Sequence, residues 1–303
     1  MKLKSISALI ILSLTSMGVY PHGNNSHFPK TQDITVKTIK LSNNVYMLQG
    51  RGGNVGALVG MEGILIVDDD YKQVSDKLSA ALKTLGSETP KYVLNTHWHA
   101  DHTEGNEVFG KTATIIAHTN VRKRMSTAQV STVFNRTQPA SPVIAWPIVT
   151  YTESMSIYFN GEEVRAVHYP SGHTDGDTVV FFAKANVVHL GDDFFVGKFP
   201  FVDLESGGSV QGLVNNIGSL ITEIPADAKL IPGHGPVSSH ADLKAYHQML
   251  LDTVKIVQDK MKAGSTLEDM KKAGLPENFR DAGTGFIKTE QWIETIYRSY
   301  SKK

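Results

Sequence analysis

The sequence predicts an α/β fold in which helices lie outside two β-sheets. Short apolar runs of strand length alternate with longer segments of helical periodicity, and this alternation occurs twice along the chain. The chain has 303 residues, of which 41% are hydrophobic, so it is long enough to bury a large core. No stretch between the two halves has the composition of a linker. We therefore expect a single domain over residues 34–303.

The N-terminal 20 residues have the composition of a secretory signal peptide. Lys2 and Lys4 precede a short apolar run, 6–14, and Ser16 and Gly18 supply small residues near a cleavage point. The run is too short to span a bilayer comfortably, and no cysteine follows it for a lipid anchor. We expect residues 21–33 to form a flexible leader. The prediction is a periplasmic or secreted protein without membrane attachment after cleavage; an uncleaved anchor helix is the alternative.

Strands dominate the first half of the predicted domain. Apolar runs predict strands at 34–40, 45–49, 55–59, 64–67, 91–95 and 113–117. Between the fourth and fifth of these, residues 72–85 have a helical apolar stripe that Gly86 ends. A second helix is predicted over 119–130. Residues 135–150 contain three prolines and predict a loop or flap.

The second half repeats this order of strands followed by helices. Predicted strands cover 155–159, 163–168, 178–182, 187–190 and 229–231, and Asn160-Gly161 is a strong signal for a hairpin turn. Helical stripes predict helices at 209–222, 240–262 and about 289–299. Ser265 to Glu268 forms a capping-box pattern that opens a short helix ending at Gly274.

Three histidines and an aspartate fall within six residues, 97–102, just after the strand predicted at 91–95. They are His97, His99, Asp101 and His102. His97 and His99 are two residues apart, so in an extended segment they point the same way. Imidazole and carboxylate together suit zinc or a similar metal. Because one metal cannot easily take four ligands from so short a loop, the pattern indicates two metals that complete their shells elsewhere.

Three further polar residues supply candidate ligands for those shells. His173 follows the strand ending at residue 168, Asp192 follows 187–190, and His234 follows 229–231. Each has a glycine directly before it, which lets the chain turn sharply into a crowded site.

These motifs resemble those of the metallo-β-lactamase superfamily of binuclear metallohydrolases. The matching residues occur in the family order: Asp68, His97-x-His99-x-Asp101-His102, Gly172-His173, Gly191-Asp192 and Gly233-His234-Gly235. The resemblance implies an αββα sandwich of two mixed sheets flanked by helices, with the site at one edge of the sheets.

The resemblance also implies a role for each of these residues. His97, His99 and His173 would hold a first metal. Asp101, His102 and His234 would hold a second, with Asp192 bridging the two. Asp68 would orient a ligand from behind, as such sites require.

The expected cofactor is a pair of zinc ions, although the same ligands suit manganese or iron. Two such metals can share a hydroxide, because binding lowers the pKa of water from 15.7 to about 7. That hydroxide would attack the substrate without a serine or cysteine nucleophile. Asp101 would orient it or move its proton, and is therefore the predicted catalytic residue.

Substrate-binding residues are less strongly indicated. Lys198, in the loop after Asp192, would bind a substrate carboxylate, or is an ordinary solvated lysine. Trp98 and Trp146 would wall the pocket, or pack in the core. The other histidines are interpreted as structural or surface residues, His189 being the least certain: His22, His27, His118, His168, His189, His240 and His247.

Composition excludes several classes of protein. The formal net charge is zero, which argues against a nucleic-acid partner and leaves a small-molecule substrate. The chain contains no cysteine, which excludes disulfides, thiolate ligands and cysteine nucleophiles. The sequence does not indicate an oligomeric state.

The leading hypothesis is an exported binuclear zinc hydrolase of a cyclic amide or ester, either β-lactamase-like or lactonase-like. The best-known β-lactamases of the superfamily have a cysteine ligand at the position of Asp192, and this chain does not. A bridging aspartate at that position is commoner in the superfamily's thioesterases, lactonases and phosphodiesterases. A thioesterase or phosphodiesterase is therefore the alternative. A non-catalytic metal-binding protein is the third hypothesis, which an Asp101→Ala variant with every measured activity intact would favour.

Overall fold

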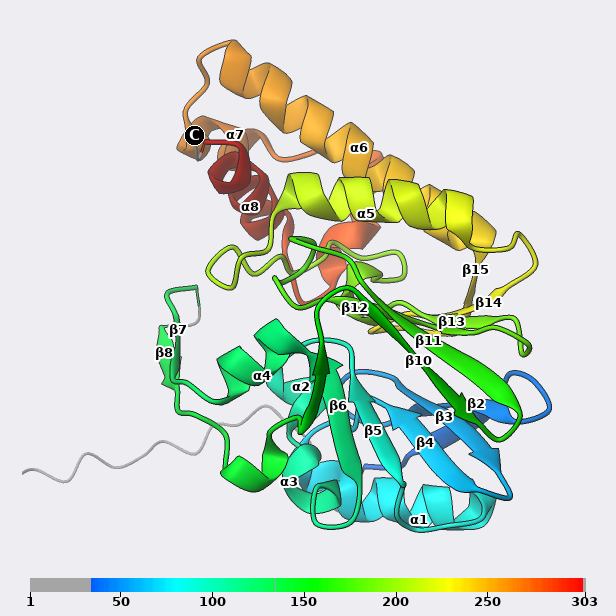
Figure 1. Cartoon of the computed structure of the whole chain (residues 1–303). Helices are drawn as coiled ribbons and strands as arrows, with labels where there is room; N and C mark the ends of the chain where they lie inside the picture. The colour runs from blue at the N-terminus through cyan, green and yellow to red at the C-terminus, as the bar shows by residue number, and fades with distance from the viewer. Residues whose placement is uncertain (1–33, 134, 302–303) are drawn as a thin grey trace, which may run out of the picture.

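The structure, a computed structural model, consists of two β-sheets packed face to face between two layers of helices (Figure 1). It describes residues 34–133 and 135–301. The predicted signal segment, 1–20, and the leader, 21–33, lie outside these residues. The predicted αββα sandwich is confirmed.

Both sheets are mixed, as predicted. The first has the order β1 (Lys37–Lys40), β2 (Val45–Gln49), β3 (Val55–Gly60), β4 (Gly63–Val67), β5 (Tyr92–Asn95), β6 (Thr114–His118) and β9 (Val149–Tyr151). The second has the order β10 (Ser154–Phe159), β11 (Glu162–His168), β12 (Thr178–Phe182), β13 (Val187–His189), β14 (Lys229–Ile231) and β15 (Ser238–Ser239). Strands β4, β5, β6 and β9 are parallel, and so are β13 and β14. Each sheet therefore gathers several carboxyl ends at one edge.

The helices divide between the two outer faces. Beside the first sheet lie α1 (Ser75–Leu85), α2 (Ala100–Thr103), α3 (Asn106–Phe109) and α4 (Thr119–Met125). The second sheet is covered by α5 (Val210–Glu223), α6 (His240–Lys262), α7 (Leu267–Ala273) and α8 (Thr289–Ser301). No helix in the described part of the chain is long and apolar enough to cross a membrane.

The core has three layers that follow from the strand patterns. Between the sheets, Leu65 and Val67 of β4 pack in one cluster with Val180 and Phe182 of β12. The opposite face of the first sheet packs against α1, and that of the second against α5, α6 and α8. Because β4 and β12 are buried on both faces, they are continuous apolar runs rather than alternating ones.

The Asn160-Gly161 turn has the predicted geometry. Both residues have positive φ, 53° at Asn160 and 73° at Gly161, as a two-residue hairpin of type I′ requires. The turn joins β10 to β11 in register, with Phe159 opposite Glu162.

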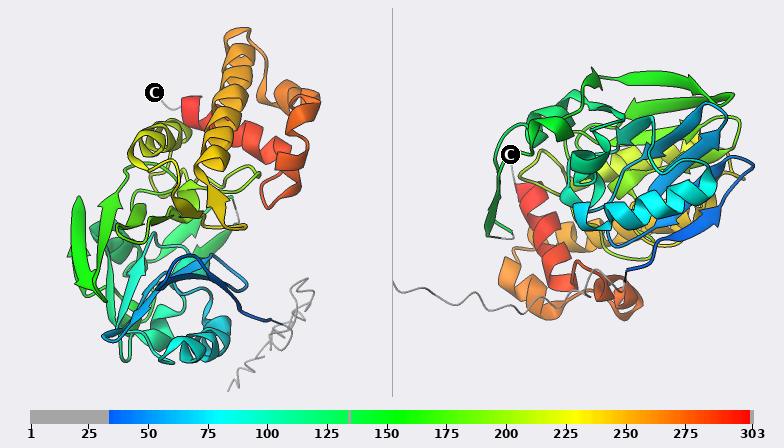
Figure 2. Two further views of the ribbon diagram at one scale, coloured as in Figure 1. Left: turned by 90° about the vertical axis from the view of Figure 1, so that its right-hand side faces the viewer. Right: turned by 90° about the horizontal axis from the view of Figure 1, so that it is seen from below.

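The helix predicted over 119–130 is wrong in its second half. Helix α4 ends at Met125, and a small separate hairpin follows, formed by β7 (Gln129–Ser131) and β8 (Arg136–Gln138). The hydroxyls of Ser126 and Thr127 both bond to the carbonyl of Lys123. Such local side-chain bonds compete with helical ones, which ends α4 early. The hairpin stands beside the sandwich, and only its second strand falls within 135–150, the segment predicted to be a loop or flap (Figures 1 and 2).

The capping box predicted at Ser265 to Glu268 is wrong by one residue, because the hydroxyl of Thr266 caps α7 by accepting from the Asp269 amide at 3.1 Å. Helix α6, by contrast, begins with a full capping box. The Ser239 hydroxyl caps the amide of Asp242, and the Asp242 carboxylate accepts from the Ser239 amide at 2.8 Å. We expect Ser239→Ala to destabilise the protein by about 1 kcal/mol, which lowers Tm by about 2–4 °C. Thermal unfolding measures this. An unchanged Tm would show that packing alone fixes the start of α6.

Candidate metal centre

Every predicted ligand follows the carboxyl end of a strand, and these ends meet at one edge of the sandwich. The loop after β5 supplies residues 97–102, and the loops after β13 and β14 supply Asp192 and His234. His173 comes from the loop between β11 and β12. The structure thus brings together seven side chains from four loops, in two groups that can each hold a metal ion.

The first group consists of three histidines whose ring nitrogens point at one another. His99 Nδ1 lies 3.1 Å from His97 Nε2 and 2.8 Å from His173 Nε2. Nitrogens bound to one tetrahedral zinc at about 2.1 Å are about 3.3 Å apart, so the arrangement is close to that of a ligand set. Asp192 Oδ2 completes the group, 3.5 Å from His173 Nε2 and 3.9 Å from His97 Nε2.

The second group lies on the other side of the same aspartate. Asp101 Oδ2 is 3.1 Å from His234 Nε2 and 3.7 Å from His102 Nε2. Asp192 Oδ1 is 3.1 Å from His102 Nε2 and 3.5 Å from His234 Nε2. One oxygen of Asp192 therefore faces each group, which is the position of a bridging ligand.

The residues present fit a divalent metal. Five imidazoles and two carboxylates form the donor set that zinc and similar ions prefer. His102 Nε2 and Asp192 Oδ1 are buried and make no hydrogen bond, although they lie only 3.1 Å apart. Leaving such polar atoms unpaired costs free energy, and a cation between them would remove that cost.

Glycine is required at two positions where the backbone passes close to Asp192 and His102. A Cβ at Gly233 would lie 1.9 Å from Asp192 Oδ1, and one at Gly53 would lie 2.1 Å from the His102 ring. No side chain fits at either position.

The sequence model of the metallo-β-lactamase superfamily matches residues 41–255 of the chain. The chain belongs to this superfamily. It is accordingly a metal-dependent hydrolase, and its His/Asp cluster suits divalent metal.

Individual relatives agree with that assignment. A probable metallo-hydrolase of Methanocaldococcus jannaschii is 28% identical over 62% of this chain and 90% of its own length. Among solved structures, a metallo-β-lactamase from Pontibacter korlensis has a TM-score of 0.59 at 16% identity, covering 72% of this chain and 99% of its own. A sec-alkylsulfatase from a Pseudomonas species has a TM-score of 0.66 at 13% identity, covering 88% of this chain but only 50% of its own. At these identities the solved structures show the fold alone.

Behind the ligands of this superfamily member, a layer of polar groups fixes the imidazole rings. Asp68, the residue predicted to orient a ligand, accepts from His102 Nδ1 at 2.8 Å and from the Thr96 amide at 2.7 Å and hydroxyl at 2.8 Å. His173 Nδ1 bonds to the carbonyl of Phe201 at 2.7 Å. These bonds leave the opposite nitrogen of each ring free to face the centre.

Asp203 plays a matching part for His99 and was not found from the sequence. Its Oδ2 lies 3.0 Å from His99 Nε2, which directs Nδ1 of that ring into the first group. No glycine or strand end marks Asp203, and it stands 104 positions from its partner, so sequence spacing contains no signal for it.

We expect Asp203→Asn to weaken metal binding about 10–100-fold, the usual effect of losing a group that orients a ligand. An amide cannot hold the His99 ring with the charge that the carboxylate supplies. Competition with a chromophoric chelator measures the affinity, and Asp281→Asn, an exposed change elsewhere, is the matched control. Equal affinities in both variants would contradict this role.

The two groups differ in charge before a metal binds. Burial lowers the pKa of His97 well below its usual range and that of His173 to about 4, so both are neutral donors. Burial acts the same way on His102 and His234, but the carboxylates of Asp192 and Asp101 outweigh it. They raise the pKa of His102 well above its usual range and that of His234 to about 10. Metal binding to the second group therefore displaces protons.

A second pair of buried carboxyls lies beneath the His173 loop. Asp177 accepts from the amide and hydroxyl of Thr174, and Asp193 from the amide of His173. Burial, aided by the charge of Asp193, raises the pKa of Asp177 well above its usual range. Burial likewise raises the pKa of Asp193 to about 7.

The folded state therefore keeps a proton that the unfolded chain releases above about pH 4. The contribution of this pair to stability falls as the pH rises from about 4 to about 7, by about 1.4 kcal/mol per pH unit for each retained proton. We expect Asp177→Asn to make this slope shallower. Denaturant unfolding of metal-free protein at pH 5, 6 and 7 measures it. The same slope in both proteins would mean that the pair is ionised.

Of the three predicted substrate residues, Trp98 is the one that contacts a candidate ligand. The Lys198 ammonium bonds to the Asp281 carbonyl at 2.9 Å and the Thr284 hydroxyl at 2.6 Å, tying two loops together. Trp98 is buried, with its ring centroid 4.8 Å from that of His99, and Trp146 packs against the same small cluster. Their roles toward substrate stay predictions.

The histidines outside the motifs have backbone partners. His189 bonds to the Asn54 carbonyl at 2.9 Å and accepts from the Gly191 amide, so it positions the loop that presents Asp192. His118 and His168 stack at 3.8 Å, and His240 and His247 bond to carbonyls of α5. His22 and His27 lie outside the described residues.

Proposed function

We propose that this protein is an exported binuclear zinc hydrolase that opens a cyclic amide or ester of small size. The observation that supports the proposal most strongly is the position of Asp192, whose two oxygens face two separate groups of ligands. His97, His99 and His173 would hold one ion, and Asp101, His102 and His234 the other. When bound, a pair of such ions supplies an acidified water as nucleophile and polarises the scissile carbonyl.

The exposed side of the centre indicates where a substrate arrives. The side chains of His234, Asp101 and His99 are 34%, 22% and 15% exposed, whereas those of His97, His102 and His173 are 1% exposed or less. A substrate therefore approaches past His234 and Asp101.

Asp101 is the candidate ligand that we propose to act on the attacking water. Burial raises the pKa of its carboxyl, but His102 and His234 outweigh burial and lower it to about 2. Its carboxylate is ionised at neutral pH and can accept a hydrogen bond from the attacking water, which would orient that water toward the scissile carbonyl.

The test is a substrate panel with the zinc-loaded mature protein. It contains a carbapenem, a cephalosporin, a lactone, a thioester and a phosphodiester, and metal content is measured alongside. Turnover of a β-lactam or lactone with two zinc ions per chain supports the proposal. Turnover of the thioester or phosphodiester alone, with two ions bound, favours the alternative. No turnover of any acyl bond overturns the proposal.

Export rests on the composition of residues 1–20 and needs a separate test. Expression of the full chain, followed by N-terminal sequencing of the periplasmic fraction, is expected to give a mature protein that starts near residue 20. A cytosolic protein that keeps Met1 would overturn this part.

A further inference from the structure

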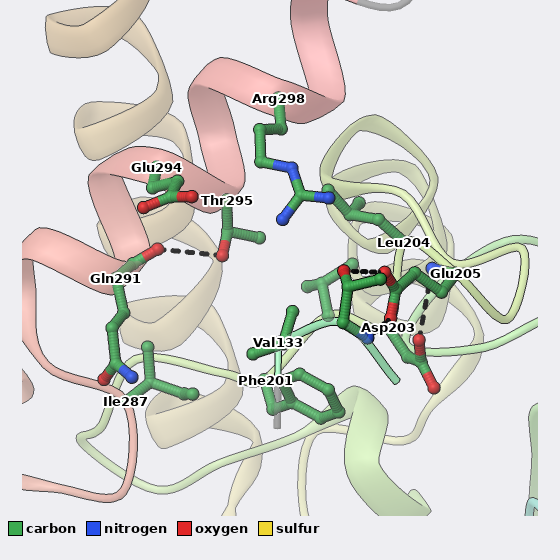
Figure 3. A pocket seen from close by; sticks show the side chains of 12 residues that line it. Val133, Phe201, Asp203, Leu204, Glu205, Ile287, Gln291, Glu294, Thr295 and Arg298 are labelled. Atoms are coloured by element: carbon green, nitrogen blue, oxygen red, sulfur yellow. Dashed lines mark hydrogen bonds between the residues drawn. The ribbon is translucent and has the colours of Figure 1, made fainter. Parts of the chain in front are cut away.

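A cavity of about 290 Å³ lies beside the metal centre and contains none of its ligands (Figure 3). Three separate segments line it: Thr132 and Val133 after β7, the loop 201–205, and residues 287–298, most of which belong to helix α8. Ligand pockets commonly measure about 300–1,000 Å³, so this cavity has room for one arm of a substrate rather than for a whole one.

The loop 201–205 joins the cavity to the centre. The ring of Phe201, which lines the cavity, lies 5.7 Å from the His99 ring and 5.8 Å from the His173 ring. Asp203, which also lines it, binds His99 directly. A group held in the cavity is therefore separated from the ligands of the first metal by only one layer of side chains.

The lining combines apolar side chains with one cation. Val133, Leu204 and Ile287 supply apolar surface, and Arg298 is the one basic residue of the lining (Figure 3). A guanidinium remains charged at all relevant pH values. Arg298 is half-buried and makes no hydrogen bond or ion pair with the part of the chain that the structure describes.

The acidic residues of the lining are engaged elsewhere. Asp203 binds His99, Glu205 binds the amide and hydroxyl of Thr132, and Glu294 pairs with Lys271 at 2.5 Å. Lys271 neutralises Glu294, whereas Asp203 and Glu205 keep their charge but already accept hydrogen bonds from other groups. Arg298 is therefore the charged group of the described lining whose donors are free to bind an anion. The three carboxylates nearby would repel a dianion such as phosphate more strongly than a monoanion.

Arg298 stands on a firmly anchored element. Trp292 of α8 is fully buried and donates to the Thr253 hydroxyl at 3.0 Å. In the last turn, the Ser299 hydroxyl accepts from the Val210 amide at 3.0 Å, and the Tyr300 hydroxyl donates to the Gln211 side chain of α5 at 2.9 Å. Helix α8 lies outside residues 41–255, the part of the chain that matches the superfamily model.

We propose that this cavity receives an arm of the substrate whose end is a carboxylate, bound by Arg298. The planar guanidinium matches a carboxylate with two parallel hydrogen bonds, and the apolar lining suits a short hydrocarbon chain before it. This inference rests on the proposed hydrolase function. It assigns the preferred substrate to the class of acyl compounds with an apolar arm and a terminal carboxylate.

The first experiment compares two esters with the zinc-loaded enzyme: mono-p-nitrophenyl adipate, which ends in a carboxylate, and p-nitrophenyl hexanoate, which has the same chain length without the charge. We expect Arg298→Met to reduce the adipate-to-hexanoate ratio of kcat/KM at least about ten-fold, mainly through KM. Arg298→Lys is expected to keep part of the preference. Arg280→Met, which changes an exposed arginine paired with Glu277, is the matched control.

An unchanged ratio in Arg298→Met would overturn the inference. A lower Tm with an unchanged ratio would do the same, because it would mean that Arg298 only stabilises the last turn of α8.

A binding measurement separates failure of this inference from failure of the proposed function. If the wild-type enzyme hydrolyses neither ester, calorimetry with 4-phenylbutyrate, which has no bond to cleave, still tests the cavity. Affinity at least about ten-fold weaker in Arg298→Met than in wild type supports the site. Equal affinity overturns it, because the carboxylate would then be binding elsewhere, such as at the metals.

Discussion

Replacing Asp192 with asparagine is expected to abolish most of the hydrolytic activity and to reduce the metal content. Asp192 is the one side chain that faces both groups of ligands, with Oδ1 3.1 Å from His102 and Oδ2 3.5 Å from His173. Removing a buried charge from such a network costs about 3–5 kcal/mol. Because about 1.4 kcal/mol corresponds to ten-fold, the rate should fall about 10²–10⁴-fold.

Metal analysis and steady-state kinetics on the same samples test this expectation. Asp227→Asn changes an exposed aspartate and is the matched control. We expect the control to keep wild-type metal content and rate. An Asp192→Asn protein that holds as much metal as wild type and turns over at the same rate would rule out a bridging role.

Replacing Asp68 with alanine is expected to destabilise the protein as well as weaken the metal site. The carboxylate is fully buried and accepts three hydrogen bonds, from His102 Nδ1 and from the amide and hydroxyl of Thr96. Its φ of 63° is also unfavourable for alanine. Three buried donors would lose their acceptor, and we expect a loss of about 3–5 kcal/mol.

For a chain of this size the loss corresponds to a fall in Tm of about 6–20 °C. Asp68→Asn keeps the shape and tolerates the backbone conformation, so it is the variant to use if the alanine protein does not fold. The exposed Asp76→Ala serves as control. A wild-type Tm in Asp68→Ala would mean that water replaces the carboxylate at no cost.

The sequence was sufficient for the sandwich and for the residues that the structure gathers at its edge. The strands such as β4 are short apolar runs bounded by turn residues, and His97, Asp192 and His234 each follow such a run directly. These signals are local, so a single sequence contains them. That these seven residues bind metal ions remains a proposal.

The parts that the sequence did not predict depend on contacts between distant segments. Strands β7 and β8 are three residues each and owe their form to pairing with each other. Asp203 and Arg298 were missed because neither stands in a motif. Only the folded chain brings the first against His99 and the second into the same cavity as Phe201.

The backbone joins the loop of Asp192 to the loop of His234, and this has a consequence for how ions are loaded. The Gly233 amide donates to the Gly191 carbonyl at 2.7 Å, and Leu190 donates to Ile231 at 2.9 Å. Ordering one loop therefore orders the other. An ion that enters either group pays the entropy of fixing both loops, so the next ion binds to a preorganised partner. If the protein binds two ions as proposed, they should consequently bind with positive cooperativity, and molecules holding one ion should be scarce at intermediate metal concentrations.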